Sequence, residues 1–244
     1  MYQQFARVYD VFMKPTAPYE KWAHYIDDVF RRNGVPAGAL VLDLACGTGS
    51  LAFLMAQKGY DMIGADASAD MLSEATGKMY EDGLPRVLFL NQDMRTLELF
   101  GTVDAAYSTC DALNYILTED DFVKTLKNVA LYLNPGGVFV FDLKMEHKYR
   151  QLAGNTYHDT VGDASYVWKN NFDPATCINE YRVQFIFRGE GSYPETHRQR
   201  AYSTAQVEKM AALAGLKMLG VFDNYSNLPA RADSERVTFA STRI

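Results

Sequence analysis

The chain has 244 residues, of which 48% are hydrophobic and 22% are charged. These fractions are typical of a globular protein and exclude a disordered or fibrous chain. Acidic residues outnumber basic ones by 30 to 24, the formal net charge is −6 and no long basic stretch is visible, so nucleic acid is disfavoured as the main partner.

Residues 1–36 are predicted to form aromatic-rich helices that either pack on the core or form a lid over a ligand. From 37 to 145, short β-branched strands alternate with helices. Strands are predicted at 40–44, 60–65, 87–90, 103–107 and 138–143, and helices at 50–58, 69–80 and 121–133. This alternation predicts βαβ units and a parallel sheet, hence an α/β core.

The pattern changes after residue 145. Residues 146–202 carry alternating aromatic-rich segments separated by turn signals such as Asp173-Pro174, which predicts an antiparallel β insertion. Residues 203–244 hold a predicted helix at 205–214, with Ser203 or Thr204 as its N-cap. Two further strands, at 218–222 and 236–242, complete the core.

The cysteines and histidines show no metal-binding or disulfide pattern. The three cysteines lie far apart without a Cys-x-x-Cys pair, and the four histidines lack ligand spacing. The N-terminus lacks the apolar run of a signal peptide, and no stretch approaches the ~20 apolar residues that span a bilayer. We therefore expect a cytoplasmic monomer or homodimer that binds no metal and no membrane.

The most informative stretch is Val-Leu-Asp-Leu-Ala-Cys-Gly-Thr-Gly at residues 41–49. A strand enters a tight turn whose two glycines, Gly47 and Gly49, let a ligand approach the backbone. The next residues open a helix whose N–H groups point at the site. Together with Ala52, these glycines also satisfy the loose dinucleotide fingerprint.

Carboxylates mark the ends of three consecutive predicted strands. Asp43 suits a cationic amino-acid ligand better than a pyrophosphate. Asp66 follows Gly47 by about 20 residues, where a carboxylate accepts both hydroxyls of a ribose. Asp93 and Met94 offer an acid and an apolar face to the amino group and ring of an adenine. We expect these side chains to bind one ligand at the carboxyl edge of the sheet.

These motifs, with Asn134-Pro135-Gly136-Gly137, resemble the class I S-adenosylmethionine (SAM)-dependent methyltransferases. Three further segments are similar to a subset of small bacterial members described as YqeM-like: Phe5-Ala6-x-x-Tyr9-Asp10, Tyr19-x-x-Trp22 and Glu195-x-His197-x-Gln199-Arg200. The resemblance implies a Rossmann-like, seven-stranded, mostly parallel sheet with helices on both faces and one antiparallel strand. The antiparallel insertion and N-terminal helices would cap the carboxyl ends of the strands. Ala45 departs from the family pattern, because many members have glycine there.

The resemblance also implies the cofactor, SAM, with S-adenosyl-L-homocysteine as product and no metal. The residues that it assigns to the cofactor are Asp43, Ala45, Cys46, Gly47, Gly49, Asp66, Ala67, Met71, Asp93, Met94, Thr109 and Asp111. Tyr9, Tyr19 and Trp22 are candidates to face the sulfonium, where a cation–π contact contributes about 0.5–2 kcal/mol.

His197, Tyr9 and Arg200 are the candidate catalytic residues. His197 could deprotonate an acceptor with Glu195 orienting it, or serve as a structural residue. Arg200 could clamp a carboxylate or phosphate of the acceptor, or pair with a surface acid. A general base is needed only if the nucleophile must lose a proton. We expect methyl transfer to an N, O or S atom of a small-molecule acceptor.

Two other classes stay open from the sequence. A non-catalytic SAM-binding regulator would carry the same binding residues. An NAD-dependent oxidoreductase would explain the Gly47–Ala52 fingerprint and Asp66. It would leave Asp43 and Asp93 unexplained, and the sequence has no Tyr-x-x-x-Lys pair for hydride chemistry.

Overall fold

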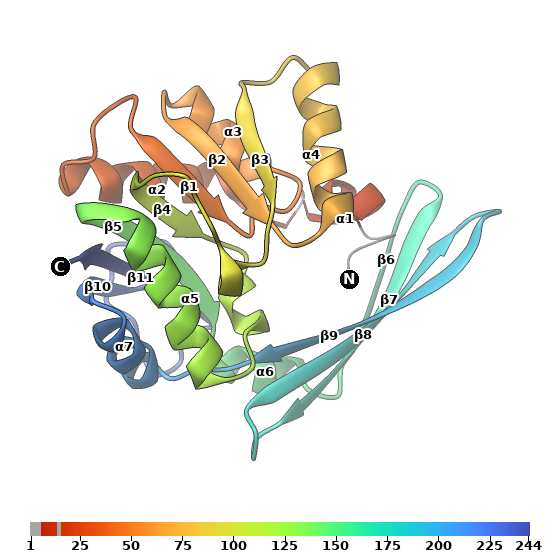
Figure 1. Cartoon of the computed structure of the whole chain (residues 1–244). Helices are drawn as coiled ribbons and strands as arrows, with labels where there is room; N and C mark the ends of the chain where they lie inside the picture. Colours follow the sequence, from red (N-terminus) through yellow and green to blue (C-terminus); the bar gives the residue numbers. More distant parts are fainter. Residues whose placement is uncertain (1–5, 14–15) are drawn as a thin grey trace.

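The computed structural model describes residues 6–13 and 16–244 as an α/β core beside a second, smaller sheet (Figure 1). The core sheet has seven strands in the order β10-β11-β5-β4-β1-β2-β3. Their bounds are β1 Leu40–Leu44, β2 Asp61–Asp66, β3 Val87–Asn91, β4 Val103–Ser108, β5 Leu133–Lys144, β10 Leu216–Asp223 and β11 Arg236–Arg243. Strand β11 runs antiparallel to both of its neighbours, β10 and β5, and the other six strands share one direction, so the predicted seven-stranded, mostly parallel fold is confirmed.

Helices cover both faces of the core sheet because successive strand residues point to opposite sides. Val41 packs with α2 (Tyr19–Arg32) and α3 (Ser50–Gln57), whereas Leu42 packs with α5 (Glu119–Tyr132) and α7 (Thr204–Leu213). The remaining core helix, α4 (Ala69–Glu81), packs along β2 and β3. The core is therefore a three-layer sandwich.

Capping side chains fix where two of these helices begin. Thr118 accepts a hydrogen bond from the Asp121 N–H, so α5 begins at Glu119, two residues before the predicted start. Ser203 and Gln206 form a capping box at α7, so Ser203 is the N-cap of the two residues predicted, and Thr204 is the first residue of the helix. Strand β5 begins at Leu133 rather than at 138, with an irregular register opposite β4.

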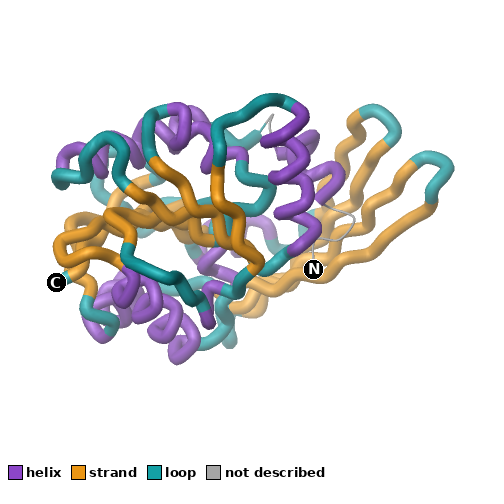
Figure 2. The backbone as a smooth tube through the Cα atoms, turned by 45° about the horizontal axis from the view of Figure 1, so that its top comes forward, coloured by secondary structure: helices purple, strands orange, loops and turns teal. Residues whose placement is uncertain are grey.

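The second sheet is antiparallel, in the order β6-β7-β8-β9, as predicted for the insertion. Its strands are β6 Thr156–Val161, β7 Ala164–Asp173, β8 Ile178–Phe187 and β9 Gly191–Arg200, and a short helix that the sequence analysis missed, α6 Glu146–Leu152, precedes them. Figure 2 shows these strands extending away from the core. We call this four-stranded sheet the cap; the exact division of the chain into four segments stays a prediction.

Helix α1 (Ala6–Met13) bridges the cap and the core; Phe5 of the predicted N-terminal motif lies outside the described residues. On one side Val8 and Phe12 pack against the apolar part of the cap, with the Phe12 and Tyr166 ring centroids 4.9 Å apart. On the other side Asp10 accepts hydrogen bonds from Thr48 Oγ1 at 2.6 Å and Ser50 Oγ at 3.2 Å.

An ion pair adds to this attachment, because Lys78 of α4 contacts the same Asp10 carboxylate. Helix α1 is therefore fastened to the glycine-containing turn and to the start of α3. Because Asp10 follows Tyr9, these contacts also set the position of the Tyr9 side chain.

We predict that Asp10→Ala loosens α1 without unfolding the core. Hydrogen bonds to a charged group contribute about 1.5–3 kcal/mol, so local opening should increase roughly 10- to 100-fold. Limited proteolysis with mass spectrometry of the N-terminal fragments measures this opening. Asp70→Ala, at an exposed position in the first turn of α4, is the matched control. Equal cleavage rates in the two variants would show that Asp10 does not hold the helix.

Candidate functional site

A cavity of about 530 Å³ lies at the carboxyl ends of the core strands, next to the cap. The order of the sheet reverses at β1, which lies between β2 and β4, and open α/β sheets bind ligands at such a point. The volume lies within the ~300–1,000 Å³ range of small-molecule sites. The predicted residues that line this cavity are Tyr9, Ala45, Gly47, Asp66, Ala67, Met71, Asp93, Met94 and Thr109.

The turn after β1 is built on left-handed backbone conformations at Ala45 (φ 64°), Gly47 (φ 55°) and Gly49 (φ 74°). Space beside Gly47 is open, whereas a Cβ on Gly49 would lie 3.0 Å from the Phe89 ring. Glycine is thus required at 49 by close packing, and Gly47 leaves backbone accessible to a ligand. Ala45 holds a conformation that costs a non-glycine residue roughly 1–2 kcal/mol.

Asp66 connects the end of β2 to this turn. Its two carboxylate oxygens accept hydrogen bonds from the Gly47 N–H and the Ser68 N–H, each at 2.8 Å. Burial raises the pKa of Asp66, and the two N–H groups oppose that rise. The Asp66 side chain still lines the cavity. Because a carboxylate oxygen can accept more than one hydrogen bond, it can also accept hydrogen bonds from the hydroxyl groups of a ligand.

Asp93 and Arg95 lie side by side at the end of β3. The guanidinium of Arg95 contacts both oxygens of Asp93, with Nε at 3.0 and 3.1 Å, and these hydrogen bonds lower the pKa of Asp93. Both residues line the cavity. The sequence analysis singled out Asp93 but missed Arg95, which follows two residues later in the 3₁₀ turn Met94–Thr96.

Three predicted cofactor residues lie behind the turn, outside the cavity lining. Asp43 is only 2% exposed and accepts a hydrogen bond from the Tyr107 hydroxyl at 3.0 Å. Burial raises the pKa of Asp43 to about 8. The Cys46 thiol packs beside Gly64, and burial raises its pKa. The side chains of Asp43 and Cys46 therefore pack against the turn on the side away from the cavity, and Gly49 is also absent from the cavity lining.

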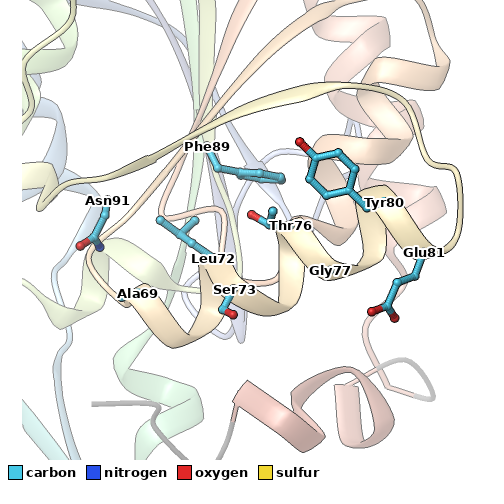
Figure 3. Close-up of a pocket in the computed structure, with 9 residues that line it drawn as sticks. All are labelled: Ala69, Leu72, Ser73, Thr76, Gly77, Tyr80, Glu81, Phe89 and Asn91. Atoms are coloured by element: carbon cyan, nitrogen blue, oxygen red, sulfur yellow. The ribbon is translucent and has the colours of Figure 1, made fainter.

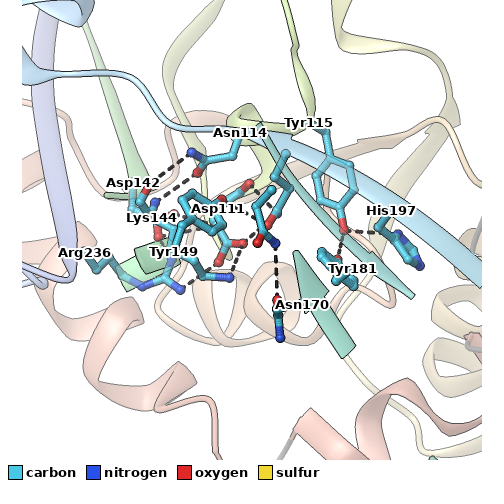
Figure 4. A network of polar contacts seen from close by, with 12 residues as sticks. Asp111, Asn114, Tyr115, Asp142, Lys144, Tyr149, Asn170, Tyr181, His197 and Arg236 are labelled. Atoms are coloured by element: carbon cyan, nitrogen blue, oxygen red, sulfur yellow. Dashed lines mark hydrogen bonds and ion pairs between the residues drawn. The ribbon is translucent and has the colours of Figure 1, made fainter. Parts of the chain in front are cut away.

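Asp111 also lies outside the cavity lining, at the centre of a buried polar network (Figure 4). Its carboxylate pairs with Lys144 at 2.9 Å and with Arg236 at 2.7 Å. Gln199 of β9 donates a hydrogen bond to it at 2.7 Å, and the Asp111 N–H faces the carboxylate of Asp142. The network joins the ends of β4, β5 and β11 to the cap.

Of the three aromatic residues predicted to face the sulfonium, only Tyr9 lines the cavity. Trp22 is 5% exposed and stacks on Tyr225, with centroids 5.1 Å apart. The Arg236 guanidinium lies 5.7 Å from the Trp22 ring, and Tyr19 meets that ring edge to face. Burial, with Cys110 and Asp10 nearby, raises the pKa of Tyr19.

His197 and Arg200 lie one layer behind the cavity surface. His197 is fully buried, and its Nδ1 lies 3.3 Å from the hydroxyl of Tyr115, which does line the cavity. Arg200 donates to the Leu117 carbonyl at 2.9 Å, and its guanidinium lies 5.2 Å from the Tyr202 ring. Arg200 therefore fastens the end of β9 to the segment that follows β4.

The residues that line the cap side of the cavity were not predicted from the sequence. Tyr115 comes from the 3₁₀ turn Ala112–Tyr115, and Thr196 and Arg198 come from β9. The one nearby signal was the resemblance, which assigned Thr109 and Asp111, just after β4, to the cofactor. The alternation of β9 could not show which strand residues approach a cavity made by another part of the chain.

A second hollow, of about 610 Å³, lies between α4 and the edge strand β3 (Figure 3). It is lined by the outer surface of α4, with Tyr80 and Glu81 at its far end. The predicted site residues lie elsewhere. The cavity at the strand ends is thus the candidate functional site.

Comparisons with known proteins give the family of the chain. The pattern of the family described as "Methyltransferase domain" matches residues 41–137. The chain is 34% identical to YqeM of Bacillus subtilis (strain 168), a protein to which methyltransferase activity is ascribed, over 100% of this chain and 97% of that one. A crystal structure of a SAM-dependent methyltransferase from Clostridium acetobutylicum ATCC 824 superposes with a TM-score of 0.87 at 31% identity, covering 99% and 98% of the two chains.

The fold and the site thus define an enzyme of the methyltransferase class. The chain belongs to the SAM-dependent methyltransferase family, and its full-length similarity to YqeM confirms the predicted subset. A more distant relative is the cypemycin N-terminal methyltransferase of Streptomyces sp, 26% identical over 82% of this chain and 81% of that one.

Within residues 6–13 and 16–244, no helix is long and apolar enough to cross a membrane. The same part of the chain contains no group of three or more His, Cys, Asp or Glu side chains arranged to hold a metal ion.

We predict that Asp111→Asn destabilises the protein in a pH-dependent way. Burial would raise the pKa of Asp111, but Lys144 and Arg236 lower it to about 2, below the ~3.9 of an unfolded chain. The ionised carboxylate therefore stabilises the fold above pH ~4, and this contribution is lost as the pH falls towards ~2. Removing one partner of a buried pair costs about 3–5 kcal/mol.

Urea denaturation of both proteins at several pH values tests this prediction. The difference between wild type and Asp111→Asn should be largest near neutral pH and should shrink below pH ~4. Glu235→Gln, which removes a half-exposed partner of Lys148, is the control and should cost less than about 1 kcal/mol. A difference that does not change with pH would contradict the assigned ionisation.

Proposed function

We propose that this enzyme transfers the methyl group of SAM to an N, O or S atom of a small-molecule acceptor. The observation that carries the proposal is one cavity with two chemically different ends. Asp66 and Asp93 line the end formed by the core strands, whereas Tyr115, Thr196 and Arg198 line the end next to the cap. A cofactor at the first end and an acceptor at the second would meet inside it.

The residues at the first end fit SAM. The open backbone at Gly47 leaves room for the ligand chain, and the Asp66 carboxylate would accept the ribose hydroxyls. Asp93 would accept a hydrogen bond from the adenine amino group once Arg95, which occupies both of its oxygens, moves aside. Asp43, which is buried behind this turn and accepts a hydrogen bond from Tyr107, would support the turn rather than contact the ligand.

Bound SAM would supply a methyl carbon activated by its positive sulfur. The protein then needs mainly to position the acceptor for in-line attack, and positioning contributes up to about 7–11 kcal/mol in model reactions. Tyr9 lines the cavity on the side of α1 and would offer its ring face to the sulfonium. The acidic overall charge and the bounded cavity favour a small molecule over nucleic acid.

The cypemycin relative, by its name, methylates an N-terminus. An amino group is therefore the first acceptor class to screen. Isotope-labelled SAM with a fractionated metabolite extract detects acceptance of any class, and the labelled product identifies the atom. Absence of methyl transfer in every fraction, despite SAM binding, would favour a SAM-binding regulator over an enzyme acting on small molecules.

We predict that ligand-free protein binds SAM and S-adenosyl-L-homocysteine with micromolar affinity and binds NAD far more weakly. Asp66→Ala should raise the Kd for SAM by about 10- to 100-fold, because hydrogen bonds to a carboxylate contribute ~1.5–3 kcal/mol. Calorimetric titration measures all three ligands. Asp82→Ala, at an exposed position after α4, is the control. Unchanged SAM affinity in Asp66→Ala, or preferential binding of NAD, would refute the assigned cofactor site.

A further inference from the structure

Three residues of the cap and one of the core form a continuous line of polar groups at the cap end of the cavity. Tyr181 on β8 pairs directly with His197 on β9, and Glu195 lies two residues before His197 on the same face of the sheet. Tyr115 approaches this face from the core (Figure 4). The line therefore starts at the cavity and ends inside the cap.

The distances along this line suit proton transfer. The Tyr115 hydroxyl contacts the Tyr181 hydroxyl and lies 3.3 Å from His197 Nδ1. His197 Nε2 lies 3.2 Å from Glu195 Oε2. The imidazole is fully buried and stacks on Tyr181, with centroids 4.8 Å apart and an interplanar angle of 10°. The ring is held in one orientation, so its two nitrogens face different partners.

This arrangement selects one tautomer of His197. A carboxylate beside Nε2 favours a proton on that nitrogen, which leaves the Nδ1 lone pair facing the Tyr115 hydroxyl. The imidazole thus has a carboxylate at ion-pair distance from its far nitrogen. Only Tyr115 of this set lines the cavity, so a substrate would meet the phenol rather than the imidazole.

We propose that Tyr115 is a catalytic residue that takes a proton from the acceptor and passes its own proton to His197. This inference rests on the proposed function and deepens it. As the bond from the acceptor to the methyl carbon forms, the carbon–sulfur bond breaks and its electron pair stays on sulfur. The acceptor proton moves to the Tyr115 oxygen, the phenolic proton moves to His197 Nδ1, and Glu195 stabilises the imidazolium. Solvent then takes the proton after product leaves.

The relay restricts the chemistry of the acceptor. A group that must lose an N–H or O–H proton, such as an amine or a hydroxyl, gains from it. A thiolate, which attacks without losing a proton, does not. His197, predicted from the sequence as the direct base, becomes a positioning residue that acts through Tyr115.

Nitrogen NMR of ¹⁵N-histidine-labelled, ligand-free protein tests the relay without any acceptor. We expect His197 with Nε2 protonated and Nδ1 bare near neutral pH. Its Nδ1 signal should shift in Tyr115→Phe, and the tautomer preference should weaken in Glu195→Gln. Protonation of Nδ1 in the wild-type protein would overturn the proposal, because Tyr115 could not then donate to it.

Kinetics with the acceptor fraction recovered from the extract screen provide the second test. Tyr115→Phe should lower kcat about 10²- to 10⁴-fold, the usual contribution of a positioned proton acceptor. Tyr193→Phe is the matched control, because it removes a cap hydroxyl that donates to the Glu190 carbonyl away from this line of groups, and it should leave kcat unchanged.

The pH profile separates a chemical role from a structural one. Wild-type kcat should fall at acid pH because the relay ends on an imidazole nitrogen; Tyr115, Tyr181 and Glu195 are the described groups that face the His197 ring. Tyr115→Phe should lose this acid limb. Equal kcat and an unchanged profile in Tyr115→Phe would overturn the relay while leaving the methyltransferase proposal intact. Failure of the wild-type enzyme to methylate any fraction would refute the proposed function instead.

Discussion

The buried carboxylate of Asp111 is the constraint on which the rest of the site depends. It compensates two cations, Lys144 at the end of β5 and Arg236 at the start of β11, and it accepts a hydrogen bond from Gln199 of β9. Leaving any one of these charges buried without its partner costs about 3–5 kcal/mol. The ends of three core strands and one cap strand therefore stay together. This fixes the position of β9 relative to the core, and with it the position of Thr196 and Arg198 in the cavity wall.

Helix α1 provides the complementary restraint at the opposite wall. Its apolar residues cover the distal half of the cap, whereas Asp10 bonds to the start of α3 and to α4. The cap is thus attached to the core twice, by ions near β9 and by α1 near its apolar part. Because the cavity lies between these attachments, its width depends on both. A change in either would move Tyr9 relative to Tyr115.

The sequence predicted the core and the turn well because their signals are local. A strand, a glycine turn and a following carboxylate lie within one βαβ unit, so the positions of Gly47 and Asp66 follow from spacing alone. The resemblance assigned Asp111 to the cofactor, but its partners Lys144 and Arg236 lie far along the chain, where no local pattern shows them. Trp22 was equally ambiguous, since helix periodicity does not say which buried surface a ring meets.

The difference between local and non-local signals also explains why the sequence points to a cofactor but not to an acceptor. The family pattern spans residues 41–137, which contain the turn, Asp66 and Asp93. Tyr9, Thr196 and Arg198 lie outside that range, on α1 and β9, yet they line the same cavity. The cap wall of the cavity is therefore built from residues that lie far apart in the sequence, which no local pattern predicts. Tyr115 lies within the matched range, but its contact with His197 comes from the cap, so the two parts of the chain complete this wall together.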